Sequence, residues 1–219
     1  MGLPGKRAVC DAPKIRFMNA IARFLTAWQV VCVTLLLTCE ARPQDRPVQQ
    51  KGNWDFSIWV TGATGEENRN SFTEAQIWTP GGFIGRVITD KIGGGWRGGN
   101  LEYGVNLMPV FVQRRPEALY GGGLDPVVLR WNSSLHAGRV VPYIELAGGG
   151  VLTNTNLPRG DTSNFNFTVR GGGGIHIFTK ERQSLEIGCR YYHVSNANLG
   201  RRNPEFNGVQ ITLGYHWFK

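Results

Sequence analysis

The residues best suited to chemistry are a histidine and a serine two positions apart near the C-terminal end of the chain, His193 and Ser195. In an extended strand the side chains alternate between two faces, so residues i and i+2 share a face and lie about 7 Å apart along the backbone. A histidine in that position can take the hydroxyl proton of the serine and activate it as a nucleophile. The spacing therefore predicts a base beside a nucleophile.

The pair lies on an apolar face of its segment. If residues 185–195 form a strand, the residues that share the face of the pair are mostly apolar: Leu185, Ile187, Cys189 and Tyr191. The opposite face carries Glu186, Arg190 and Tyr192. On a strand that crosses a membrane, a polar pair near the strand end is also tolerated without any chemistry, because it lies at headgroup depth. Both interpretations stay open at this point.

A third polar group lies twelve positions beyond the serine. Asn207 has the parity of the apolar residues that follow it, so its carbonyl oxygen can accept a hydrogen bond from the free ring nitrogen of His193. Glu205 shares that parity and is the alternative orienting acid, although it lies further into the loop. Asn196, next to Ser195, is expected to donate its amide to a developing oxyanion.

These residues have to be positioned by strands, because the chain beyond residue 52 breaks into eight strand-like segments separated by Gly, Asn and Pro. None of the intervening stretches has a helical period. The segments span residues 53–63, 72–90, 96–114, 122–135, 138–154, 163–179, 183–196 and 206–218. Evenly spaced strands of this kind predict an all-β fold, either a sandwich or a barrel.

Polar and apolar residues alternate along these segments. In the sixth segment one face carries Phe165, Phe167 and Val169, and the other carries Asn166, Thr168 and Arg170. The pattern fits a soluble sandwich with an apolar core and also a membrane barrel with an apolar outer surface. Segments of about ten or more residues suit a tilted membrane crossing. The last segment also ends in aromatic residues before Lys219, as outer-membrane barrels tend to.

Together with the N-terminal export signal described below, these features favour an eight-stranded antiparallel transmembrane outer-membrane β-barrel. Eight strands make a barrel whose interior side chains can fill. The alternation predicts that the following residues point inward: Glu145, Arg170, His176, Glu186, Arg190 and His216. They carry opposite charges that can pair within the barrel. An exported soluble sandwich that binds a ligand is the alternative fold.

The N-terminal part of the chain has the pattern of an export signal. A basic leader precedes the uncharged apolar run 24–37, and small residues follow at the cleavage region. We expect residues 1–41 to be a cleaved signal peptide, with Met18 as an alternative true start, because the leader is long. A transmembrane anchor is the competing interpretation, but the apolar run is shorter than the roughly 20 residues that a bilayer requires. Residues 42–52 then form a periplasmic tail, and residues 53–219 form the barrel.

Removal of residues 1–41 changes the cysteine and charge balance. Only Cys189 remains, so we expect neither an intramolecular disulfide nor a cysteine metal site. No histidine has metal-ligand spacing with another histidine or an acidic residue, which predicts no metal. The net charge falls from +8 to +5, because five basic and two acidic residues are lost. No basic cluster is interleaved with aromatic residues, which argues against nucleic-acid binding.

The segment His193-Val194-Ser195-Asn196-Ala197 resembles the His-x-Ser-Asn-Ala motif of the PagL-type lipid A 3-O-deacylases, which are eight-stranded outer-membrane barrels. The resemblance continues through Asn203-Pro204 and, more loosely, through residues 107–112 and 142–148, and it covers most of residues 53–219. It implies that the histidine is the general base, that the serine is the nucleophile, and that the asparagine after it stabilises the oxyanion. It also implies an active site that faces the outer leaflet.

One position departs from this family. Its best-known members carry a glutamate as the orienting acid, whereas a gapless comparison places Asn207 there. An asparagine can still fix a histidine tautomer, as it does in Cys-His-Asn proteases, but it cannot stabilise imidazolium by charge. The sequence therefore leaves two alternatives open: the enzyme is slower with Asn207, or Glu205 orients His193 instead.

The resemblance implies an outer-membrane esterase that removes the 3-O-linked acyl chain from lipid A of lipopolysaccharide without a cofactor. Its partner would be lipid A in the outer leaflet, and Leu185, Ile187 and Tyr191 would present an apolar wall to the acyl chain. Whether the barrel forms a homodimer is left open by the sequence. The alternative function is a non-catalytic small barrel that binds lipid or a partner through its loops.

Overall fold

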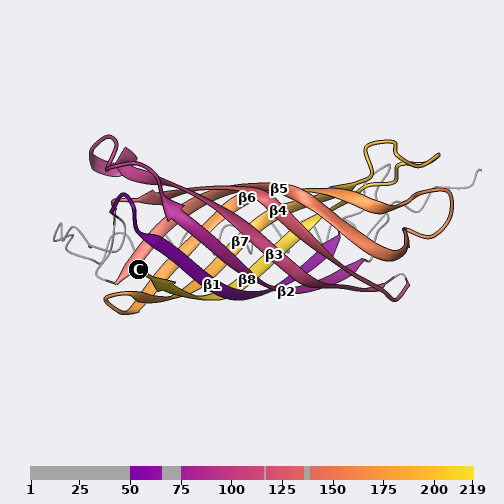
Figure 1. The fold of residues 1–219 in the computed structure, drawn as a ribbon, viewed down its shortest axis with the longest axis horizontal. Helices are drawn as coiled ribbons and strands as arrows, with labels where there is room; N and C mark the ends of the chain where they lie inside the picture. Colours follow the sequence, from indigo (N-terminus) through magenta and orange to yellow (C-terminus); the bar gives the residue numbers. More distant parts are fainter. Residues whose placement is uncertain (1–49, 66–74, 116, 136–138) are drawn as a thin grey trace, which may run out of the picture. The chain divides into compact units, whose positions relative to one another are not determined.

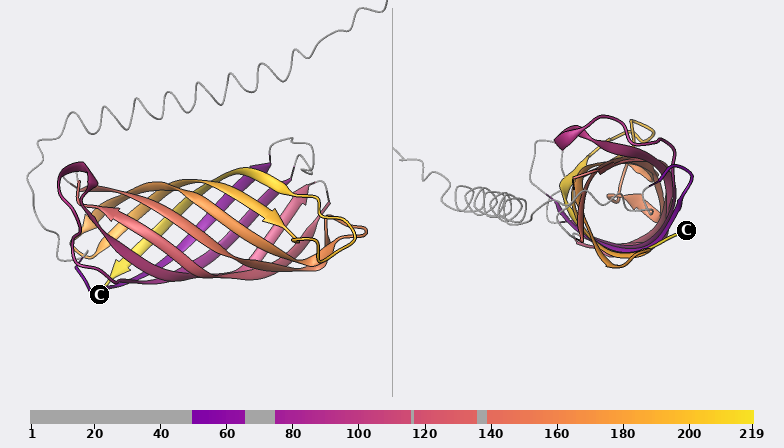
Figure 2. Two further views of the ribbon diagram at one scale, coloured as in Figure 1. Left: turned by 90° about the horizontal axis from the view of Figure 1, so that it is seen from above. Right: turned by 90° about the vertical axis from the view of Figure 1, so that its left-hand side faces the viewer.

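Eight antiparallel strands close into a barrel in the computed structural model, which describes residues 50–65, 75–115, 117–135 and 139–219 (Figure 1). The strands are β1 (Trp54–Gly65), β2 (Gln76–Val87), β3 (Gly99–Arg115), β4 (Leu119–Ser133), β5 (Val140–Leu157), β6 (Ser163–Lys180), β7 (Gln183–Ser195) and β8 (Phe206–Phe218). Each strand pairs with the next, and β8 pairs back with β1. The end-on view of Figure 2 shows the closed ring, which leaves no strand edge unpaired.

The predicted fold class is confirmed, and the strand ends are the main differences. Residues 96–98 were expected to begin the third strand, but residues 95–97 form the short 3-10 helix η2 (Gly95–Arg97) and β3 begins after it. The fifth strand continues to Leu157, three residues beyond its predicted end. The strands are 12 to 18 residues long, which exceeds the length needed for a tilted crossing.

Most of the N-terminal region lies outside the described residues. The predicted signal peptide 1–41 and all but residues 50–52 of the predicted tail 42–52 belong to this part, and so does the start of the second predicted strand at residues 72–74. The boundaries of the signal and the tail therefore stay predictions. Among the described residues, no helix combines the length and the apolar character needed to cross a membrane.

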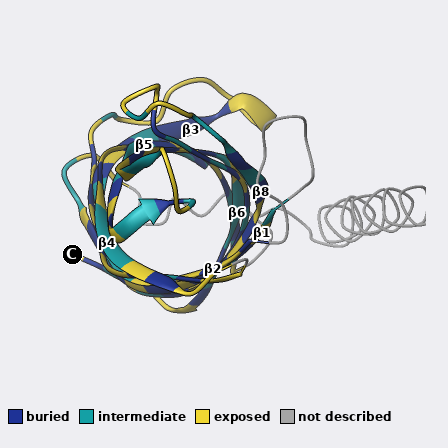
Figure 3. Cartoon of the chain, turned by 90° about the vertical axis from the view of Figure 1, so that its right-hand side faces the viewer, coloured by how far each residue is buried: buried dark blue, intermediate teal, exposed yellow. Residues whose placement is uncertain are grey.

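The strand alternation places polar side chains inside the barrel and apolar ones outside. On β6, Asn166 and Thr168 are buried, whereas Phe165 and Phe167 are 38% and 42% exposed. Figure 3 shows the same alternation of buried and exposed positions along the strands. A soluble sandwich would reverse this arrangement, since its apolar faces must be buried. The closed barrel with an apolar outer surface therefore replaces the alternative sandwich fold.

The barrel interior holds the predicted polar residues. All six residues expected to point inward are buried, and four of them join with Asp55 and Arg130 in a set that we call the interior ionic cluster. Its members are Asp55, Arg130, Glu145, Glu186, Arg190 and His216. Each charge faces an opposite one, which offsets the cost of removing these groups from water.

The contacts of the interior ionic cluster are short. Arg130 Nη2 lies 2.7 Å from Glu145 Oε2, and Arg190 Nη2 lies 2.7 Å from Glu186 Oε1. His216 lies between two carboxylates, with Nδ1 2.8 Å from Asp55 Oδ1 and Nε2 2.9 Å from Glu186 Oε2. These contacts connect β1, β4, β5, β7 and β8 across the lumen. They therefore link five of the eight strands through side chains inside the barrel.

Candidate active site

The pairing of β7 with β8 brings the predicted site residues together. His193 on β7 lies directly opposite Asn207 on β8, and Ser195 is the last residue of β7. The inward neighbours of His193, Tyr192 and Val194, are each 1% exposed and therefore fix the parity of the strand. By alternation, the side chains of all three site residues point to the outer surface. The site is thus a cross-strand pair extended by one residue along β7.

The three side chains form a continuous hydrogen-bonded chain. His193 Nδ1 lies 2.7 Å from Asn207 Oδ1, and His193 Nε2 lies 3.0 Å from Ser195 Oγ. An amide carbonyl oxygen can only accept, so Nδ1 carries the proton and donates it to Asn207. The lone pair of Nε2 is then left to accept the hydroxyl proton of Ser195. This order of hydroxyl, imidazole and amide is the arrangement of a nucleophile, a base and an orienting group.

Two further side chains contact the orienting amide. The hydroxyl of Tyr191 donates to Asn207 Oδ1 at 2.5 Å, and Asn207 Nδ2 donates to Glu205 Oε2 at 3.5 Å. Glu205, the alternative orienting acid, therefore contacts Asn207 and reaches His193 only through it. Sequence reasoning placed Tyr191 on the correct face but missed its contact with Asn207. The feature of the sequence that could have indicated this contact is the position of Tyr191, two residues before His193 on the same face.

The side chain of Asn196, which was expected to stabilise an oxyanion, has hydrogen-bond partners in the loop after β7. This residue is 0% exposed, its Nδ2 donates to the carbonyl oxygen of Arg202 at 2.8 Å, and its backbone N–H donates to Asn203 Oδ1 at 2.9 Å. Alternation explains these contacts, because the residue after Ser195 must point to the opposite face. Asn196 therefore holds the loop between β7 and β8, and its amide does not face the serine.

The expected apolar wall is only partly at the site. Tyr191 is 53% exposed on the outer surface and adjoins the orienting amide. Leu185 and Ile187 lie on the same face, but they precede His193 by eight and six residues. A strand rises about 3.3 Å per residue, so they lie about 26 Å and about 20 Å from His193 along β7. Tyr191 is thus near enough to act at the site, whereas Leu185 and Ile187 line a distant part of the barrel surface.

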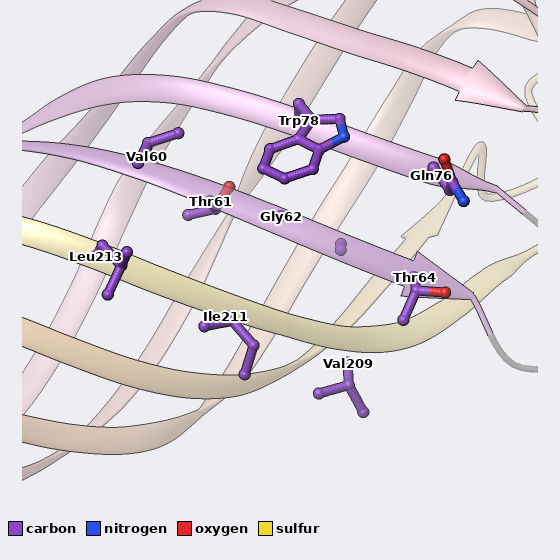
Figure 4. Close-up of a pocket in the computed structure, with 10 residues that line it drawn as sticks. Val60, Thr61, Gly62, Thr64, Gln76, Trp78, Val209, Ile211 and Leu213 are labelled. Atoms are coloured by element: carbon purple, nitrogen blue, oxygen red, sulfur yellow. The ribbon is translucent and has the colours of Figure 1, made fainter. Parts of the chain in front are cut away.

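An apolar groove of about 510 Å³ lies on the outer surface of β1, β2 and β8 (Figure 4). On β8 it begins at Val209, two residues from Asn207 on the same face, and continues along Ile211 and Leu213. Gly62 and Trp78 contribute the other side, where the indole ring lies over Gly62 so closely that a Cβ there would be 3.3 Å from it. The groove therefore continues the outward row of residues that starts at Asn207. Sequence reasoning missed it, because it needs three strands in register.

The described part of the chain offers little for metal chemistry. No group of three or more His, Cys, Asp or Glu side chains within it is placed to hold a metal ion, and Cys189 is a free thiol.

Comparison with known proteins identifies relatives of the chain. A family model described as lipid A 3-O-deacylase (PagL) matches residues 71–216, which is well over half of the chain. Comparison with curated proteins finds no match. The matched range includes the whole of β7 and the loop between β7 and β8, and it ends within β8.

Solved structures agree with the barrel fold. The outer membrane enzyme PagL superposes with a TM-score of 0.51 at 16% sequence identity, covering 73% of this chain and 97% of that one. Neisserial surface protein A (NspA) gives a TM-score of 0.48 at 14% identity, with 76% of this chain and 99% of that chain covered. At such identities, the likeness to PagL bears on the fold alone.

Proposed function

Because the chain belongs to the PagL family of lipid A 3-O-deacylases and is an outer-membrane β-barrel, we propose that it removes the 3-O-linked acyl chain of lipid A by a serine–histidine mechanism. The observation that carries the mechanism is the position of His193 between Ser195 and Asn207 on the outer surface of the barrel. The substrate lipid would reach this surface from within the bilayer. It would not need to enter the barrel.

The first half of the reaction forms an acyl-enzyme. His193 Nε2 takes the hydroxyl proton of Ser195 while Oγ attacks the ester carbonyl carbon, and the carbonyl oxygen takes the negative charge. The tetrahedral intermediate then expels the sugar oxygen, which takes the proton from Nε2 and leaves as a hydroxyl. The acyl chain is left as an ester on Ser195, and the sugar oxygen is free.

The second half of the reaction regenerates the enzyme. A water molecule loses a proton to His193 Nε2 and attacks the acyl-serine, and the Ser195 oxygen leaves with that proton. The products are a fatty acid and free enzyme. Throughout, Asn207 holds the proton of His193 on Nδ1, so that Nε2 remains available as the base.

The depth of the site suits a lipid substrate. With a cleaved signal the mature N-terminus lies in the periplasm, so odd-numbered strands end at the outer surface and the Ser195 end of β7 lies in the external leaflet. The ester carbonyls of lipid A lie at that level, between headgroup and hydrocarbon. Polar catalytic side chains are tolerated there, because the interface is hydrated.

Mass spectrometry of lipid A from cells that express the protein tests this proposal. We expect loss of one acyl chain with the wild type and with Ser133→Ala, which removes a half-exposed serine at the end of β4, and no loss with Ser195→Ala. Loss with Ser195→Ala would rule out the assigned nucleophile. No loss with any protein, when all three are folded in the outer membrane, would overturn the deacylase and favour the non-catalytic barrel.

A further inference from the structure

The orienting group of this site has two chemically different ends. A carboxylate presents two equivalent oxygens, whereas the carboxamide of Asn207 presents one oxygen and one NH₂ group. If the amide turned over, Nδ2 would face His193 Nδ1 and donate to it. The ring proton would then move to Nε2, and the nitrogen that faces Ser195 could no longer accept a proton. An asparagine at this position therefore works in only one of its two orientations.

Two contacts favour the working orientation. The hydroxyl of Tyr191 donates to Asn207 Oδ1 at 2.5 Å, so this oxygen accepts from both Tyr191 and His193. The carboxylate of Glu205 lies 3.5 Å from Asn207 Nδ2 and can only accept when ionised. A reversed amide would bring its oxygen against that carboxylate. The Tyr191 hydroxyl would then accept from the NH₂ group and lose the acceptor for its own proton.

The strand geometry makes the tyrosine contact possible. Tyr191 pairs with Val209 in the ladder, and Asn207 is the diagonal neighbour on the same face. Diagonal neighbours across an antiparallel pair lie within reach of aromatic side chains. The contact lies on the outer surface of the barrel, beside the contact of Asn207 with His193.

We propose that Tyr191 and Glu205 are positioning residues that lock the Asn207 amide with its oxygen toward His193. With its amide fixed in this way, Asn207 can accept the hydrogen bond from His193 Nδ1 as a carboxylate would. This inference rests on the proposed function, because it assigns His193 as the base. Tyr191 makes the shorter contact, but Glu205 distinguishes the two orientations more strongly, because an ionised carboxylate can only accept whereas a hydroxyl can also accept from a turned amide.

A double-mutant cycle tests the lock. The purified barrel in detergent micelles is given lipid A, and Tyr191→Phe is compared in the native background and in the Asn207→Asp background. In the native background we expect kcat to fall about three- to tenfold with KM unchanged, as for one lost hydrogen bond. In the Asn207→Asp background the same change should have a clearly smaller effect, because a carboxylate has no wrong orientation. Glu205→Gln should follow the same pattern with a loss at least as large, because the glutamine amide can pair with either orientation of Asn207.

The control and the contrary outcomes are defined by the same assay. Tyr215 lies at the end of β8 far from the site, and its hydroxyl donates to Gln183 on β7. Tyr215→Phe removes this hydroxyl and should leave kcat unchanged. Equal losses for Tyr191→Phe in both backgrounds would overturn the lock and indicate a direct action of Tyr191 on the substrate. No loss in the native background would also overturn it.

Nitrogen-15 NMR of the His193 ring tests the lock without any turnover. In Ser195→Ala the partner of Nε2 is absent, so the tautomer depends on the Asn207 side alone. We expect one tautomer, protonated at Nδ1, and a mixture of both tautomers after Tyr191→Phe and Glu205→Gln are added. A single unchanged tautomer would overturn the lock. Deacylation that persists in Ser195→Ala would instead overturn the assigned nucleophile, so the two failures are distinguishable.

Discussion

His216 inside the barrel and His193 on its outer surface have similar surroundings and different chemistry. Both histidines have hydrogen-bond partners on both ring nitrogens. His216 is 0% exposed, and it lies between Asp55 at 2.8 Å and Glu186 at 2.9 Å. His193 is half-buried, and it lies between Asn207 at 2.7 Å and Ser195 at 3.0 Å.

The partners decide what each histidine can do. Ionised carboxylates only accept hydrogen bonds, so both ring nitrogens of His216 are used as donors, and no lone pair remains. This residue therefore acts as a cationic cross-link between β1, β7 and β8. The amide oxygen beside His193 accepts one proton, while the hydroxyl of Ser195 brings a proton of its own. Only this second arrangement leaves a ring nitrogen free to accept a proton, so the type of residue alone does not identify a histidine that can act as a base.

The largest expected effect separates the two histidines directly. His193→Ala removes the base, and we expect kcat/KM for lipid A to fall about 10³-fold, which is a typical contribution of general-base catalysis. The urea midpoint for unfolding from lipid vesicles should stay unchanged, because the side chain lies on the surface. An activity of His193→Ala within tenfold of the wild type would contradict the assignment of His193 as the base.

The complementary change addresses the interior ionic cluster. Glu186→Ala removes the shared partner of Arg190 and His216, which keep Glu145 and Asp55, and leaves the buried cluster with one positive charge in excess. We expect the free energy of unfolding in vesicles to fall by about 3–5 kcal/mol. The activity per folded molecule should be preserved, because the cluster lies inside the barrel. A folded variant with lost activity would show that the interior acts on the outer site.

A smaller change sharpens the contrast between amide and carboxylate. Asn207→Asp gives His193 a charged partner like those of His216, but only on the side of Nδ1. The carboxylate should stabilise the imidazolium that forms during the reaction, and we expect kcat to rise about tenfold. Purified protein in micelles with lipid A provides the measurement. A fall in kcat would indicate that the site is adjusted to the neutral amide.

The smallest effect concerns the distant part of the outer surface. Leu185 lies about 26 Å along β7 from His193. For Leu185→Ala we therefore expect kcat/KM to stay within about twofold of the wild type. The same assay on purified protein measures it. A loss of tenfold or more would restore Leu185 as part of the wall for the acyl chain.

Local alternation explains what could be predicted from the sequence. A period of two assigns each residue of a strand to one of two faces, so the inward position of Glu186 and the outward positions of His193 and Ser195 follow without knowledge of neighbouring strands. Turn residues then mark eight strands, and their apolar outer face favours a membrane barrel. The resemblance to the PagL family could be recognised from the motif around Ser195 alone. All of these are properties of single segments.

Contacts between segments could not be predicted in the same way. The contact of Tyr191 with Asn207 requires the register of β7 against β8, and the contact of His216 with Asp55 requires the closure of β8 onto β1. The role expected for Asn196 stays a prediction, and the contact of its amide with the Arg202 carbonyl could not be predicted from the motif.

The sequence by itself thus determined the strands, their faces and the residue types at the site. The tertiary structure decided which partners each side chain meets and how the amide of Asn207 is oriented. The physical reason is that hydrophobic alternation acts along a single strand, whereas register and barrel closure depend on all eight strands pairing at once.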